Sequence, residues 1–135
     1  MHGQETDYDP RHNPHKVHHG LKRVVMAAGH SIAGLRFALQ EESAFRQELI
    51  LGALMAPWAF IIDFGRVEQI LLLSSIILVL VTELLNSGIE ATVDRISFQH
   101  HSLSKRAKDY GSAAVFLSLV LCAAIWITLL LPHLY

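Results

Sequence analysis

Hydrogen-bonding side chains recur with helical spacing between residues 82 and 96, directly after the uncharged run 70–81. They are Glu83, Asn86, Glu90 and Asp94. On a helix at about 100° per residue, all four fall within one arc of roughly 80°. Burying a carboxylate at membrane depth costs at least about 2.5 kcal/mol. Three carboxylates on one face therefore require cations, a metal ion or a water-filled cleft.

Polar contacts between helices are the ordinary alternative explanation of such a stripe. Asn side chains provide them routinely, and Asn86 fits that role. The three carboxylates fit it poorly, because like charges on one face repel and only Arg95 is close in the sequence as a counter-ion. The stripe therefore indicates a functional site.

The chemistry that these carboxylates suit is the binding of a divalent cation together with a phosphorylated ligand. Mg²⁺ takes hard oxygen ligands and keeps water and phosphate oxygens in its shell. Lys108 and Asp109, which precede the apolar run 111–131, suit a nucleotide. The P-loop, the GxGxxG fingerprint and the HRD loop of soluble nucleotide-binding proteins do not occur in the sequence.

Long apolar helices must position these residues. The run 111–131 is uncharged and, at about 1.5 Å per residue, can cross a hydrocarbon core of roughly 30 Å. It belongs to a predicted third span, 104–132, which follows a first span, 43–62, and a second span, 67–97, that carries the stripe. We therefore predict an all-α membrane protein. Three spans are too thin to bury the stripe and also enclose ligands, so a second copy is predicted to complete the site.

The segment before the spans, 20–40, is predicted to form an amphipathic surface helix. Its apolar stripe consists of Leu21, Val24, Val25, Ala28, Ile32, Leu35 and Leu39. The same stripe also permits packing on the bundle, but we favour the membrane interface because three spans offer little soluble surface. Residues 1–19 form a polar, His-rich tail whose histidine spacings match no closed metal site, which favours a solvated tail or a residual tag.

Lys and Arg are distributed unevenly around the predicted spans. They are frequent before the first span and in the second connection, whereas the connection between the first two spans holds only Arg66. This asymmetry predicts a cytoplasmic amino terminus and a cytoplasmic second loop. The formal net charge of -1 gives no argument for a nucleic-acid partner. The single cysteine, Cys122, is predicted to serve packing.

Three stretches of the chain resemble the sequence blocks of the small bacterial diacylglycerol kinases. They are AAGHSIAGLRFALQEESAFRQE, ELLNSGIEATVDRI and AKDYGSAAV. The resemblance implies a homotrimer in the bacterial inner membrane, with an amino-terminal surface helix and three transmembrane helices per subunit. It also implies transfer of the ATP γ-phosphate to diacylglycerol, with Mg²⁺, at active sites shared between subunits. On this basis residues 20–135 are expected to form the membrane kinase domain.

The resemblance also implies roles for individual residues. Glu83 matches the general base, and Glu42 and Glu90 match the carboxylates that hold the metal on ATP. Nucleotide contacts are implied for Lys108, Asp109, Gln99 and His101, together with Glu42, Glu90 and His30. The lipid and transfer site is implied for Arg23, Ser31, Arg46, Glu48, Glu83, Asn86 and Ser112, with Asn86 next to the chemistry and Asp94 as another polar site residue. The sequence departs from well-known members at His30, where they have Tyr, and at Met26 and Ala33, where they have Lys.

Two other functions stay open at the level of the sequence. Undecaprenol kinase shares the fold and the phosphoryl donor, although the full AFRQE and NSGIEATVDR spellings are more similar to the diacylglycerol enzymes. A non-enzymatic membrane oligomer or a small ion-coupled transporter would use the acidic stripe as a proton or cation relay. Magnesium-dependent lipid phosphorylation separates the kinases from this last class.

Overall fold

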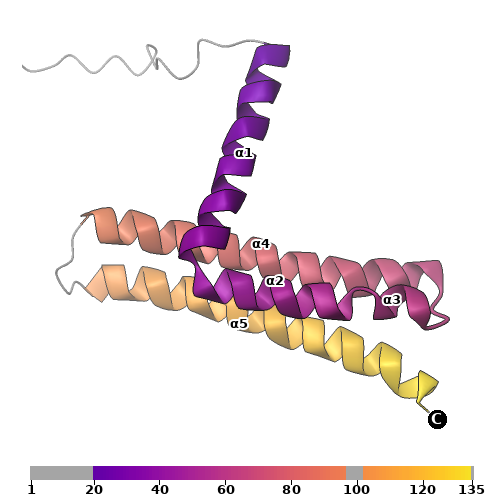
Figure 1. Ribbon diagram of the computed structural model, residues 1–135. Helices are drawn as coiled ribbons and strands as arrows, with labels where there is room; N and C mark the ends of the chain where they lie inside the picture. The colour runs from indigo at the N-terminus through magenta and orange to yellow at the C-terminus, as the bar shows by residue number, and fades with distance from the viewer. Residues whose placement is uncertain (1–19, 97–101, 135) are drawn as a thin grey trace, which may run out of the picture. The chain divides into compact units, whose positions relative to one another are not determined.

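The computed structural model describes residues 20–96 and 102–134. Within these ranges the chain is all-helical, as the sequence predicts. Its helices are α1 (Leu21–Glu41), α2 (Ser43–Met55), α3 (Trp58–Ile61), α4 (Arg66–Ile96), α5 (Ser102–Leu130) and the short 3-10 helix η2 (Leu131–His133) (Figure 1). The chain divides into two units, residues 1–36 and 37–135, each of which is described by itself.

The first unit contains most of α1. Gly20 precedes the helix with a φ of 70°, a backbone conformation that glycine adopts without steric cost, and its carbonyl accepts the backbone N–H of Arg23 at 3.1 Å. The apolar side chains of Leu21, Val24 and Val25 are each more than 60% exposed. An exposed apolar stripe on a charged helix is typical of a helix that lies in a membrane interface.

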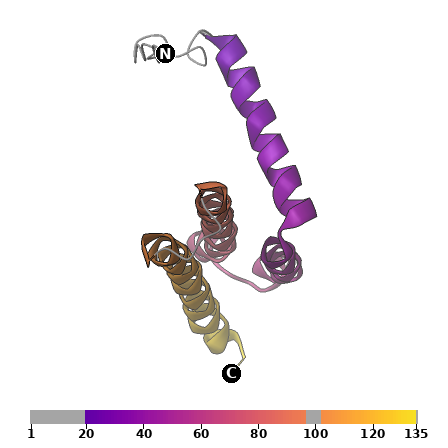
Figure 2. The same cartoon turned by 90° about the vertical axis from the view of Figure 1, so that its left-hand side faces the viewer.

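In the second unit, α4 lies between α2 and α5 (Figure 2). α4 contacts both neighbours. Two glycines permit close approach of the helices: a Cβ on Gly52 of α2 would overlap Ile76 of α4, and a Cβ on Gly111 of α5 would overlap Asn86 of α4. Small residues at helix interfaces allow this spacing inside a membrane.

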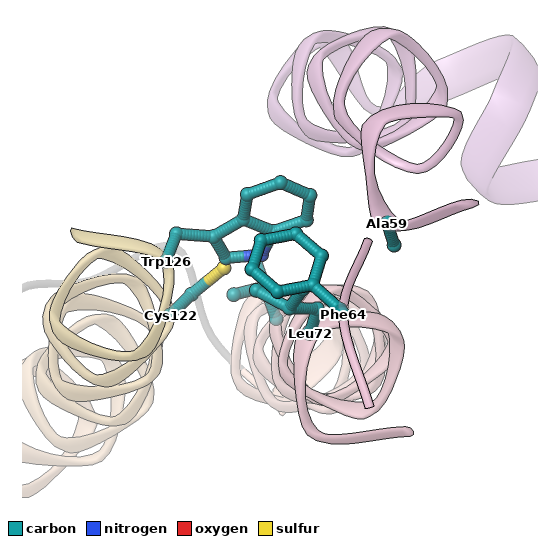
Figure 3. Close-up of a cluster of buried hydrophobic side chains, with 6 residues drawn as sticks. Ala59, Phe64, Leu72, Cys122 and Trp126 are labelled. Carbon is teal, nitrogen blue, oxygen red and sulfur yellow. The ribbon is translucent and has the colours of Figure 1, made fainter. Parts of the chain in front are cut away.

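A cluster of buried apolar side chains joins α3, α4, α5 and the loop before α4 (Figure 3). Its members include Ala59, Phe64, Leu72, Val79, Cys122 and Trp126. Leu72 on α4 is fully buried. One turn further along α4, the Ser75 hydroxyl donates to the Leu72 carbonyl at 2.7 Å and lies 3.4 Å from the Cys122 sulfur of α5. Cys122 therefore serves packing between α4 and α5, as the sequence predicts.

The region of the first predicted span, 43–62, is built from two helices rather than one. α2 ends at Met55, and α3 begins at Trp58. Pro57 lies between them and has no backbone N–H, so it cannot continue the hydrogen-bonding pattern of α2. The backbone instead closes a tight turn in which the Ala59 N–H donates to the Ala56 carbonyl at 3.2 Å.

Two stretches of the described chain are long and apolar enough to cross a membrane, Arg66–Ile96 and Ser102–His133. In the most apolar 18-residue part of Arg66–Ile96, only 28% is buried within the chain. In the corresponding part of Ser102–His133, only 17% is buried. The core helix of a soluble protein would be mostly buried. These helices instead present their apolar side chains outward, where lipid or another copy of the chain can cover them.

Candidate active site

The polar stripe lies on the middle and final turns of α4. Because α4 is one unbroken helix from Arg66 to Ile96, the helical spacing of the stripe is realised as a single face. Glu83 is buried, with only 5% of its surface exposed, whereas Asn86, Glu90 and Asp94 are half-buried. The face thus runs from a buried carboxylate toward a more accessible end.

Carboxylates from α2, from α4 and from the junction between α1 and α2 gather around Glu83. The charge of Glu83 interacts with those of Glu90 and Glu42, and the charge of Glu48 on α2 interacts with that of Glu83. Glu42 has an extended backbone before α2, and its side chain does not cap that helix. A buried oxygen of Glu48, Oε2, has no hydrogen-bond partner. The repulsion between Glu83 and each of the other three carboxylates makes this region attractive to a cation.

Asn86 is hydrogen-bonded to one of these carboxylates. Its Nδ2 donates to Oε1 of Glu90 at 3.3 Å, one helical turn further along α4. A carboxylate that accepts such a hydrogen bond has a restricted orientation. Glu90 is therefore oriented by its neighbour. Glu83 lies deeper in the bundle and forms no ion pair with any of the described residues.

A lysine from α5 provides the counter-ion at the accessible end of the stripe. Lys108 Nζ lies 2.6 Å from Oδ1 of Asp94, and the charge of Lys108 also interacts with that of Glu90. From the sequence, Arg95 was the only nearby candidate for this role. Arg95 is exposed, and the packing of α5 on α4 supplies Lys108 instead.

Other predicted site residues of the second unit point elsewhere. Asp109 pairs with Lys105 of its own helix at 2.6 Å on the exposed surface. Ser112 is also exposed. Arg46 donates to the carbonyl oxygens of Leu39 at 3.3 Å and Gln40 at 3.0 Å, so its guanidinium satisfies the end of α1 rather than an acidic side chain.

Three further predicted site residues lie in the first unit, on α1. Arg23 and His30 are exposed there, and the Ser31 hydroxyl donates to the Ala27 carbonyl of the same helix at 3.0 Å. The structure describes them only within that unit. Gln99 and His101, predicted to contact nucleotide, lie outside the described residues, as does the His-rich tail.

A pair of hydroxyl groups next to Glu83 was not anticipated from the sequence. Thr82 Oγ1 and Ser118 Oγ are 2.8 Å apart and connect α4 with α5. Ser118 also donates to the Val115 carbonyl at 2.7 Å. The sequence places a hydroxyl residue inside each of two apolar spans, which indicates a polar contact between helices. It does not indicate which two residues form the contact.

Glu42 and Glu90, whose charges both interact with that of Glu83, are candidates to hold a magnesium ion together with a phosphorylated ligand. Among the described residues, no group of three or more His, Cys, Asp or Glu side chains is arranged to hold a metal ion alone. Mg²⁺ commonly takes one or two protein carboxylates, with phosphate and water oxygens as its other ligands. Glu42 and the oriented carboxylate of Glu90 provide that number of hard oxygen donors.

Long helices with outward-facing apolar side chains, one of which carries a buried carboxylate, are the architecture of a membrane protein. The chain belongs to the prokaryotic diacylglycerol kinase family, which it matches over residues 29–130. It is 48% identical over 119 residues to the diacylglycerol kinase of Pseudomonas aeruginosa, covering 88% of this chain and 97% of that relative. It is 45% identical over 117 residues to the Escherichia coli K12 diacylglycerol kinase, covering 84% and 93% of the two chains. With the diacylglycerol kinase of Haemophilus influenzae it shares 42% identity over 107 residues, which cover 79% and 91%.

Proposed function

We propose that this protein phosphorylates diacylglycerol to phosphatidic acid in the membrane, with ATP as donor and Mg²⁺ as the required metal. The observation that carries the proposal is the buried carboxylate of Glu83, surrounded by Glu42 and Glu90, on a chain that is 48% identical to a diacylglycerol kinase. A phosphotransferase for a membrane alcohol needs a base near the lipid and anionic ligands for the metal near the nucleotide. Glu42, Glu83 and Glu90, which we call the acidic cluster, offer both.

Glu83 is the proposed general base. Its carboxylate accepts the proton of the lipid hydroxyl while the hydroxyl oxygen forms a bond to the γ-phosphorus of ATP. The bond from the γ-phosphorus to the oxygen bridging the β-phosphate breaks, and ADP leaves with that oxygen. The depth of Glu83 in the bundle, at 5% exposure, keeps bulk water away from the group that activates the acceptor.

Glu42 and Glu90 are the proposed metal ligands, and Asn86 is the proposed neighbour that orients Glu90. When bound, Mg²⁺ neutralises the charge of the nucleotide phosphates. Asn86 already donates to Glu90 in the structure. Glu83 can act as the base while Glu90 binds the metal, because the two residues are seven positions apart on α4 and about 10 Å apart along its axis.

The other binding roles are proposals that rest on the family relationship. For the nucleotide they concern Lys108, Asp109, Gln99, His101 and His30. For the lipid they concern Arg23, Ser31, Arg46, Glu48 and Ser112. Asp94 is proposed to hold Lys108 at the nucleotide, which their 2.6 Å contact supports.

The assembly and the topology are also proposed. We infer a homotrimer in the bacterial inner membrane, with three transmembrane helices per subunit, a surface helix, and a cytoplasmic amino terminus and second loop. The mostly outward-facing apolar surfaces of α4 and α5 support association with lipid or other copies. Asp109 supports shared sites, because it is exposed and pairs with Lys105 of its own helix, which leaves it accessible to another copy of the chain. In this proposal residues 20–135 form the kinase domain and residues 1–19 a separate tail.

The acceptor lipid is tested by competition. Purified protein in lipid nanodiscs is supplied with ATP, Mg²⁺ and equal amounts of diacylglycerol and undecaprenol, and the products are measured by mass spectrometry. We expect phosphatidic acid as the main product and none when Mg²⁺ is chelated. Undecaprenyl phosphate as the main product would assign the other acceptor, and the absence of both products would refute kinase activity.

A further inference from the structure

We propose that Gly111 is a positioning residue for the metal site, acting through Asn86 on Glu90. Gly111 is buried on α5 at its contact with α4. It lies 25 positions from Asn86 in the sequence, and only the packing of the two helices brings them together. The inference rests on the proposed role of Glu90 as a metal ligand, and it adds a residue that itself touches neither metal nor substrate.

Gly111 lies directly against the side chain of Asn86. A Cβ atom at this position would overlap Asn86 Oδ1 and lie 3.3 Å from Asn86 Cγ. The Asn86 amide is thus the first group that a side chain at position 111 meets. The backbone is further away, with Asn86 Cα at 3.6 Å from the added Cβ, which is an ordinary van der Waals distance. A methyl group would therefore displace the amide rather than separate the helices.

A 180° rotation of the Asn86 amide, which would exchange the positions of Oδ1 and Nδ2, cannot relieve this overlap. An ionised carboxylate only accepts hydrogen bonds, so Nδ2 of Asn86 must face Glu90 Oε1, to which it donates at 3.3 Å. Oδ1 is then directed at Gly111, where it is buried without a hydrogen-bond partner. The absent side chain of Gly111 is what leaves room for this orientation. Any larger residue must turn the amide away from Glu90.

Loss of this hydrogen bond should weaken the binding of Mg²⁺, which can be measured. Partners that orient a metal ligand typically change metal affinity by about 10-fold to 100-fold when they are removed. The experiment measures binding of Mg²⁺ with a non-hydrolysable ATP analogue by calorimetry, and the thermal midpoint of each variant in the same detergent. Gly111→Ala should raise the half-saturating Mg²⁺ concentration at least about tenfold. Asn86→Ala should raise it by a similar factor.

The double variant Asn86→Ala, Gly111→Ala identifies the route of the effect. With the amide removed, the added methyl meets no atom closer than the 3.6 Å contact. The double variant should therefore need no more Mg²⁺ than Asn86→Ala alone, and it should regain the thermal stability that Gly111→Ala loses. Multiplication of the two single shifts would overturn the inference, because it would show that the residues act independently.

Gly52→Ala is the matched control. It adds the same methyl group at another tight helix contact, where Ile76 is the residue it meets. It should lower the thermal midpoint without changing the Mg²⁺ requirement, and an equal Mg²⁺ shift would overturn the inference in favour of general loosening of the bundle. Gly88→Ala, at a position with open space around it, should change neither quantity.

Failure of the inference and failure of the proposed function give different results. If Glu90→Gln raises the Mg²⁺ requirement and Gly111→Ala does not, Gly111 has no positioning role. If Glu90→Gln itself has no effect, the metal role of Glu90 is wrong and the inference falls with it. Should Gly111→Ala fail to fold, recovery of folding in the double variant would support the overlap with Asn86, and continued failure would overturn it.

Discussion

Lys108 Nζ on α5 lies 2.6 Å from Oδ1 of Asp94 on α4, so a cation from one helix is held against the acidic face of another. Both side chains are more than a third exposed, and ion pairs of this kind contribute little to stability. Their contact therefore matters chiefly for where the lysine is held, which is at the accessible end of the stripe beside Glu90.

The first prediction is a coupling between these two residues. Asp94→Asn should weaken nucleotide binding by about twofold to fivefold, because Lys108 loses the contact that fixes its position. In a Lys108→Met background the same change should have no further effect. Calorimetric titration of a non-hydrolysable ATP analogue into the four proteins measures this cycle. Independent effects would show that Asp94 does not act through Lys108.

The second prediction concerns the base. Glu83→Gln should keep the fold and nucleotide binding but lower turnover by at least about a hundredfold, because the amide cannot accept the proton of the lipid hydroxyl. Phosphatidic acid formation at saturating ATP measures turnover, and calorimetry measures binding. Near-normal turnover in the folded variant would remove Glu83 from this role.

The third prediction concerns the metal ligands. Glu42→Gln and Glu90→Gln should each raise the Mg²⁺ requirement and weaken nucleotide binding together, because each change removes one charged oxygen donor from the cation. Asp63→Asn provides the control, since Asp63 is an exposed carboxylate in the loop between α3 and α4. Unchanged magnesium titrations in both Glu variants would contradict the assignment.

The fourth prediction is recovery of activity in mixed oligomers. The charge of Glu83 interacts with those of Glu42 and Glu90 of the same chain, whereas Asp109 pairs with Lys105. The boundary between shared halves is therefore expected between the acidic cluster and Asp109, rather than between Glu42 and Glu83. Inactive Glu83→Gln and Asp109→Asn proteins, mixed, unfolded and reassembled, should regain activity at up to about a quarter of their sites.

The control for this experiment is the mixture of Glu42→Gln with Glu83→Gln, which should stay inactive if both residues serve one site from the same chain. Cross-linking establishes that mixed oligomers have formed. Mixed oligomers without activity for every pairing of a base variant with a nucleotide-site variant would refute shared sites.

The fifth prediction concerns stability. Leu72 is fully buried between helices, so Leu72→Ala should destabilise the folded protein by about 2–5 kcal/mol through lost contacts and a cavity. Leu117→Ala is the matched control, because Leu117 is 65% exposed in the single chain. Reversible unfolding in mixed micelles measures both. Equal losses would show that Leu117 is buried by another copy.

The all-helical fold followed from the sequence because helical periodicity and long apolar runs are local properties. The interruption at Pro57 did not, since apolarity alone treats 43–62 as one segment and takes no account of the missing backbone donor. The single-faced stripe on α4 followed from the spacing of Glu83 and Glu90, but their chemical roles stay predictions. The pairing of Lys108 with Asp94 depends on how α5 packs on α4, which no local pattern encodes.

Because Cys122 contacts Ser75 between α5 and α4, its reaction with thiol reagents can report on the separation of these helices. Cys122 is the sole cysteine of the chain, and it is 8% exposed at the interface of α4 and α5. A membrane-permeable thiol reagent can modify it only when those helices separate. The rate of alkylation in unmodified protein therefore measures how often the bundle opens, and its slowing by substrate would measure how tightly a bound lipid or nucleotide holds the helices together.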